Sequence, residues 1–110
     1  MLTKITSIEE ARKAPLRKFA VNGEEVVCGV VEGRPFAFAS TCPHKGGPLD
    51  QGELLAPNRI RCPWHGYEFD VFDGEVLYNP YPPKYGKWRD TGRLKVFRAE
   101  ERDGFVCLDV

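Results

Sequence analysis

The hydrophobic positions of this chain alternate over short stretches and predict a protein built mainly from β-strands. Phe36 and Phe38, for example, alternate with two alanines, which is the period-two pattern of a strand with one buried face. Stretches of this kind predict strands over 16–21, 25–32, 35–40, 53–55, 59–61, 67–71, 75–78, 93–99 and 104–110. Short strands with a turn about every eight to twelve residues are typical of an antiparallel sandwich or barrel.

Turn residues separate these strands. Asn22-Gly23, Asp73-Gly74 and Asp103-Gly104 are dipeptides that favour tight hairpin turns. One helical turn is predicted over 7–13, because Ser7 followed by Glu10 resembles a capping box. No repeat or linker interrupts the pattern, so we expect a single domain over residues 1–110.

Composition and charge narrow the classes of function. The 110 residues contain sixteen basic and sixteen acidic side chains, and this balance argues against nucleic acid as a partner. The chain contains no apolar run of about eighteen residues, so no membrane span is predicted. The first residues are charged and do not resemble a secretory signal, which makes the cytoplasm the expected compartment.

Two short segments carry the candidate chemistry. Cys42-Pro43-His44 and Cys62-Pro63-Trp64-His65 each supply one thiol and one imidazole, and seventeen residues lie between His44 and Cys62. Two sulfur and two nitrogen donors favour a binuclear iron–sulfur centre with one iron on sulfur and one on nitrogen. Structural zinc also accepts mixed Cys and His ligands, although its familiar patterns place both cysteines on one knuckle. Core thiols beside unrelated histidines are the remaining alternative.

The pattern C-x-H, seventeen residues, C-x-x-H resembles the Rieske [2Fe–2S] family, and the neighbouring segments 46–49 and 66–70 extend the match. The resemblance implies an antiparallel sandwich or barrel base with a cluster-binding subdomain inserted at about 40–70. It implies one [2Fe–2S] cluster per chain. Cys42 and Cys62 would bind the inner iron, and His44 and His65 the outer iron.

Two cysteines remain outside this set. Cys28 and Cys107 lie in apolar strand segments and are predicted to be buried thiols. A disulfide between them is an alternative that a reducing compartment disfavours.

Departures from the respiratory members of the family indicate a low-potential, ferredoxin-type protein. Respiratory Rieske proteins carry an extra cysteine in each loop, joined as a disulfide, and Gly47 and Trp64 occupy the matching positions here. Their serine and tyrosine hydroxyls match Tyr67 and Phe69, and Phe69 has no hydroxyl to donate to sulfur. Trp64 is predicted either at a docking surface or folded onto the proline-rich stretch 79–83, which the resemblance places over the cluster.

A run of basic residues follows the proline-rich stretch. It could steer an acidic redox partner or simply form a solvated face. Its members are Lys84, Lys87, Arg89, Arg93, Lys95 and Arg98.

Three functions remain open on these grounds. The first is a soluble one-electron carrier between a flavin- or NAD(P)H-dependent reductase and a terminal oxygenase acting on aromatic rings or related substrates. Such a carrier is not an enzyme itself, and the sequence shows no nucleophile–base pair or nucleotide-binding loop. The second is a fixed small subunit of a larger oxidoreductase, such as a nitrite or arsenite oxidoreductase. The third is a zinc-stabilised interaction module.

Overall fold

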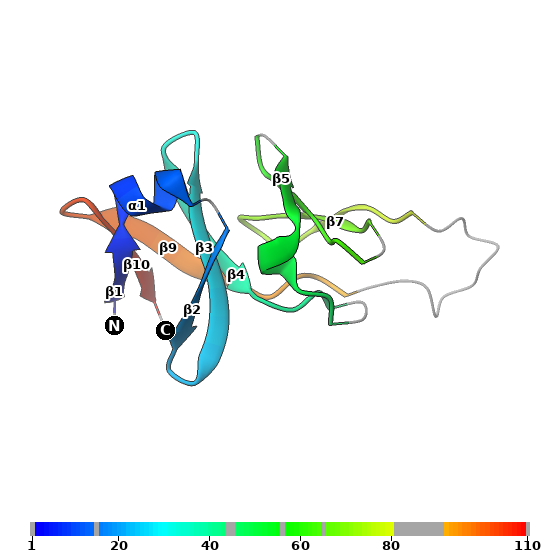
Figure 1. Cartoon of the computed structure of the whole chain (residues 1–110), viewed down its shortest axis with the longest axis horizontal. Coiled ribbons are helices and arrows are strands. Elements are labelled where there is room, and N and C mark those ends of the chain that lie inside the picture. The colour runs from blue at the N-terminus through cyan, green and yellow to red at the C-terminus, as the bar shows by residue number, and fades with distance from the viewer. Residues whose placement is uncertain are drawn as a thin grey trace.

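The computed structural model describes residues 2–14, 16–43, 46–55, 57–64, 66–80 and 92–109. These residues form two antiparallel sheets that lie next to each other along the long axis of the molecule (Figure 1). The larger sheet has the order β1-β10-β9-β4-β3-β2. Its strands are β1 (Leu2–Ser7), β2 (Arg17–Val21), β3 (Glu24–Val31), β4 (Arg34–Ala39), β9 (Val96–Arg102) and β10 (Phe105–Asp109). The smaller sheet consists, in order, of β5 (Glu53–Leu55), β6 (Arg59–Arg61), β7 (Glu68–Asp70) and β8 (Val76–Tyr78). The all-β prediction is confirmed.

The predicted helical turn is α1 (Ile8–Lys13), and it packs against β1, β3 and β10. The Ser7 hydroxyl accepts a hydrogen bond from the Glu10 backbone N–H at 3.1 Å, which caps the helix as the sequence predicts. Ile8 and Ala11 are the buried residues of the helix. The helix therefore covers one face of the larger sheet.

The central strands of the larger sheet are buried on both faces. Val26 and Cys28 point into a core inside the base, together with residues of α1 and β10. Val27, Phe36 and Phe38 point the other way, into a second core shared with the smaller sheet. The two phenylalanine rings stack with their centroids 5.7 Å apart. The base thus provides an apolar platform on which the smaller sheet rests.

The smaller sheet is an insertion between β4 and β9. These two strands pair directly, with Ala37 opposite Phe97, so the chain leaves and re-enters the base at neighbouring strands. A short 3-10 helix, η1 (Leu49–Gln51), precedes β5. The inserted subdomain is confirmed, and it extends beyond the predicted limit of about residue 70 to Tyr78, because β8 pairs with β7.

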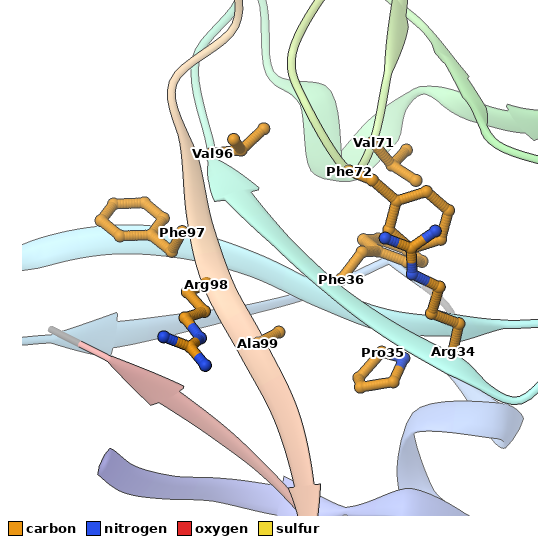
Figure 2. Close-up of a pocket in the computed structure, with 9 residues that line it drawn as sticks. All are labelled: Arg34, Pro35, Phe36, Val71, Phe72, Val96, Phe97, Arg98 and Ala99. Carbon is orange, nitrogen blue, oxygen red and sulfur yellow. The ribbon is translucent and has the colours of Figure 1, made fainter. Parts of the chain in front are cut away.

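A contact between an arginine and an aromatic ring joins the insertion to the base. The guanidinium of Arg34 on β4 lies over the ring of Phe72, which follows β7, at 3.8 Å from the ring centroid (Figure 2). Phe36 meets the same ring edge-on at 6.4 Å between centroids. Beside this contact lies a cavity of about 340 Å³, bounded by β4, β9 and the turn after β7. Of the predicted ligand residues that the structure describes, neither Cys42 nor Cys62 lines it.

Within the described residues, no helix has the length and apolar character needed to cross a membrane. β1 is a strand that the hydrophobic pattern does not predict.

Candidate metal centre

The first predicted ligand loop begins at Cys42 and is closed by two backbone hydrogen bonds. The Gly46 N–H donates to the Cys42 carbonyl at 2.8 Å, and the Cys42 N–H donates to the Gly47 carbonyl at 2.9 Å. Thr41 and Pro48 form an isolated antiparallel bridge just outside the loop. The loop is therefore a tight turn whose two ends are held together by backbone hydrogen bonds.

The second loop has the same backbone arrangement. The Gly66 N–H donates to the Cys62 carbonyl at 3.1 Å, and the Cys62 N–H donates to the Tyr67 carbonyl at 2.8 Å. In both loops the cysteine carbonyl accepts a hydrogen bond from the N–H of the fourth residue after the cysteine. The cysteine N–H donates to the carbonyl of the fifth residue after it. The fold thus presents two cysteines in equivalent local settings.

The fourth position of each loop is glycine because the backbone there is left-handed. Gly46 has φ 76° and Gly66 has φ 80°, a region that residues with a Cβ enter at a cost of about 1–2 kcal/mol. The sequence carried this signal as a glycine at the same offset from each cysteine.

The two cysteine side chains lie in one core. Cys42 and Cys62 are each 2% exposed and pack with Leu49, Ile60 and Tyr67 among others. Neither forms a disulfide. Two thiols of adjacent loops in one buried setting suit the sulfur side of a binuclear iron centre, since thiolates tolerate burial beside a cationic metal.

The two histidines, His44 and His65, lie outside the described residues. In sequence each falls within its loop, two residues after Cys42 and three after Cys62. Among the residues that the structure describes, no group of three or more His, Cys, Asp or Glu side chains could hold a metal ion.

The other two cysteines are not part of this site. Cys28 on β3 and Cys107 on β10 are buried in the base and form no disulfide. Burial raises the pKa of the Cys28 thiol to about 12, so the thiol stays protonated and behaves as a small apolar side chain. The alternative of a Cys28–Cys107 disulfide is wrong.

A buried carboxylate braces the second loop, and sequence reasoning missed it. Glu68 on β7 is 6% exposed and accepts from Arg59 Nη1 at 2.7 Å and from Arg61 Nε at 3.2 Å, both on β6. Arg61 also contacts Glu53 on β5 at 3.1 Å. The hydrogen bond from Arg59, together with Arg61, lowers the pKa of Glu68 despite its burial. Sequence reasoning could have found the ion pairs of Glu68 only from the pairing register of β6 and β7, which places Arg61 opposite Glu68.

Trp64 is the most exposed large hydrophobic residue in the described part of the chain, at 56%. Pro43 and Pro63, which each follow one of the two cysteines, are also exposed. This exposure agrees with a place at the loop tip. Asn79 and Pro80 are described, but the rest of the proline-rich stretch, including Pro82 and Pro83, lies outside the described residues.

Two described members of the basic run have acidic partners, and the third, Arg93, donates to the Asp73 carbonyl at 3.2 Å. Lys95 contacts Glu24 at 2.9 Å, and Arg98 contacts Glu100 at 2.8 Å. The first pair was not predictable from sequence, because its members are 71 residues apart. These charges favour a solvated face. Lys84, Lys87 and Arg89 lie outside the described residues.

Comparison with known proteins agrees with this geometry. The model of the family described as the Rieske [2Fe-2S] domain matches residues 2–101. The chain belongs to this family. Membership implies one [2Fe–2S] cluster, and the buried cysteines of the two equivalent loops fit it.

Curated relatives share this domain within longer chains. The chain is 32% identical over 102 residues to the oxygenase component of dicamba O-demethylase of Stenotrophomonas maltophilia, covering 91% of this chain and 28% of that protein. It is 35% identical over 92 residues to the carnitine monooxygenase oxygenase subunit of Escherichia coli K12, covering 80% of this chain and 24% of that protein. The chain thus spans less than a third of the length of these curated relatives.

Solved structures share the fold. A chain in the complex of reduced oxygenase and oxidized ferredoxin of carbazole 1,9a-dioxygenase superimposes with a TM-score of 0.79 at 25% identity, over 97% of this chain and 91% of that one. The ferredoxin of carbazole 1,9a-dioxygenase from Nocardioides aromaticivorans IC177 superimposes with a TM-score of 0.82 over 98% and 96% of the two chains. Its identity of 19% supports the fold alone.

Proposed function

We propose that this chain is a soluble one-electron carrier of the cytoplasm and not itself an enzyme. In this proposal it receives electrons from a flavin- or NAD(P)H-dependent reductase and passes them to a terminal oxygenase. The observation that carries the proposal is the pair of equivalent loops, each presenting a buried cysteine to one core. The superposition on a chain of the oxygenase–ferredoxin complex of carbazole 1,9a-dioxygenase, over 97% of this chain and 91% of that one, supports it.

The ligand assignment is part of the same proposal. Cys42 and Cys62 hold the inner iron of the cluster, and His44 and His65 hold the outer one. The cluster supplies reversible one-electron chemistry. The protein excludes water from the sulfur side, since both cysteines are 2% exposed, and in sequence each histidine falls in the same loop as one of the cysteines. The whole chain, 1–110, acts as one Rieske domain.

The choice of partner rests on a known complex that contains a similar chain. In carbazole 1,9a-dioxygenase, a ferredoxin and an oxygenase form a complex. One chain of that complex is similar to this chain. We infer a terminal oxygenase as electron acceptor, and the reductase follows because a carrier must be reduced before each transfer. The family match favours the iron–sulfur centre over structural zinc.

The test combines metal content with electron delivery. Purified protein should contain about two irons and two acid-labile sulfides per chain, and the reduced protein should be reoxidised by a Rieske terminal oxygenase. Cys62→Ser should lose the cluster, since one anchor of the second loop disappears. Cys28→Ala is the matched control, because this thiol is buried outside the site; it should keep the cluster.

One zinc per chain in place of iron would contradict the proposal. A Cys62→Ser protein with an unchanged visible spectrum would contradict the ligand assignment. If the chain were recovered only as a stoichiometric subunit of a large oxidoreductase, the free-carrier proposal would be wrong and the fixed-subunit alternative would hold.

A further inference from the structure

Gly47 lies where the first ligand loop meets the side chains of the second. A Cβ built on Gly47 would lie 2.9 Å from Cys62 Sγ and 3.2 Å from both Cγ and Cδ2 of Trp64. Real Cβ atoms essentially never approach another heavy atom to less than 3.0 Å. Unlike Gly46, Gly47 does not have a left-handed φ. The position therefore excludes a side chain for lack of space and not because of its backbone conformation.

We propose that Trp64 and Gly47 form a noncovalent clamp that keeps the two ligand loops together and covers the sulfur of Cys62. The inference deepens the proposed function and rests on it. The indole lies on the backbone of Gly47, and the same backbone faces Cys62 Sγ. Opening this contact would expose the sulfur and let the second loop move away from the first.

The clamp accounts for two features that exposure alone leaves unexplained. Trp64 is 56% exposed, yet Cγ and Cδ2 of its indole ring face Gly47 in the other loop. Cys62 is 2% exposed although its neighbours Pro63 and Trp64 are exposed. An indole that packs partly on Gly47 explains both observations. The part of the ring next to Gly47 shields the sulfur of Cys62, and the rest of the ring remains in solvent. Trp64 is thus a positioning residue that acts through Cys62.

A double-mutant cycle measures this contact directly. The readout is the rate at which the holoprotein loses its cluster to an excess of an iron chelator, followed by visible absorbance. Trp64→Ala should speed cluster loss about tenfold, within the range of coupling found for residues in contact. Gly47→Ala should also speed it, because the added methyl pushes on Cys62 Sγ and on the indole. The double variant should lose the cluster more slowly than the product of the two single effects predicts, since removing the indole relieves part of the overlap.

Two controls separate the clamp from a general loss of stability. Tyr78→Ala removes another exposed aromatic residue of the same sheet, at 50% exposure, and should leave the rate within about twofold. Trp64→Phe keeps a ring over Gly47 and should restore most of the retention. The thermal midpoint of the base, followed by far-UV circular dichroism, should not change in step with the cluster-loss rate.

The outcomes are distinguishable. Equal cluster-loss rates in wild type and Trp64→Ala, or strictly multiplicative single effects in the double variant, would overturn the clamp and leave the carrier function standing. Absence of iron and sulfide from the wild-type protein would overturn both.

Discussion

At the scale of single residues, Gly74 shows how one missing side chain connects the insertion to the base. Its φ is 78°, and a Cβ there would overlap the carbonyl oxygen of Leu94. The Gly74 carbonyl accepts a hydrogen bond from the Leu94 N–H at 2.9 Å. Leu94 is 2% exposed and belongs to the core that contains Cys42 and Cys62. The turn after β7 is therefore fixed against the segment that returns to the base.

Gly74→Ala should destabilise the protein more than Gly33→Ala. Gly33 has the same φ, 78°, but no atom lies within 4 Å of its built Cβ. Gly33→Ala should therefore lower the unfolding free energy only by the cost of a left-handed backbone at alanine, about 1–2 kcal/mol. Gly74→Ala adds the overlap with Leu94, and the sum is about 2–5 kcal/mol. Urea unfolding of both variants measures the difference. Equal losses would mean that the turn moves away from Leu94 without penalty.

The same scale shows which parts of the site can be read from sequence. Cys42 and Cys62 and the glycines at their fourth positions were predictable, because each signal lies within a few residues of one segment. The contact of Gly47 with Trp64 was not, because it depends on how two separate loops meet in space. The ligand roles of Cys42, Cys62, His44 and His65 all stay predictions, as does the low potential expected from the missing hydroxyl of Phe69.

At the scale of elements, the β6–β7 hairpin carries the second loop and is braced by charge. Glu68 accepts from two arginines of β6, so the strand that enters the loop at Cys62 is tied to the strand that leaves it. Glu68→Gln should lower the unfolding free energy by about 1.5–3 kcal/mol at pH 7, the range for hydrogen bonds to charged groups. Glu53→Gln is the control, because it contacts the same Arg61 from an exposed position; its loss should stay below about 1 kcal/mol.

The pH dependence of this brace follows from the lowered pKa of Glu68. A carboxyl whose pKa is lower in the folded state stabilises the fold above its unfolded value, about 4.3. That contribution disappears as the pH falls through the folded-state pKa. The difference in unfolding free energy between wild type and Glu68→Gln should thus be constant from about pH 6 to 8 and shrink below about pH 4. A difference that stays constant at low pH would show that packing, not charge, is responsible.

Strand prediction succeeded where alternation was regular and failed where pairing decides. β5 and β6 have the predicted limits, and β2, β3 and β4 differ from them by one residue. β1 was missed because its apolar residues, Leu2 and Ile5, do not alternate: the register with β10 shifts between Lys4 and Thr6. An edge strand of this kind is defined by its partner and not by its own pattern.

At the scale of the whole molecule, the fold has two cores with different dependence on the cluster. The core of the base is formed by α1, β3 and β10 and contains neither Cys42 nor Cys62. The second core contains both, along with Ile60, Phe69 and the platform residues of β4. The proposed cluster would join the two ligand loops, so the two cores should respond unequally to its removal.

Hydrogen exchange of holoprotein and apoprotein tests this division. In the apoprotein, the amides of β6 and β7 around Ile60 and Phe69 should exchange at least about tenfold faster, which corresponds to a loss of about 1.4 kcal/mol in local opening free energy. The amides of Val106 and Leu108 on β10 should keep their protection, because their side chains pack in the base core. Loss of protection in both regions by the same factor would show that the chain unfolds as one unit and that the cluster stabilises the base as strongly as the insertion. Unchanged protection in β6 and β7 would instead show that packing around the two cysteines holds the loops without the metal, which would leave the clamp of Trp64 on Gly47 as the stronger link between them.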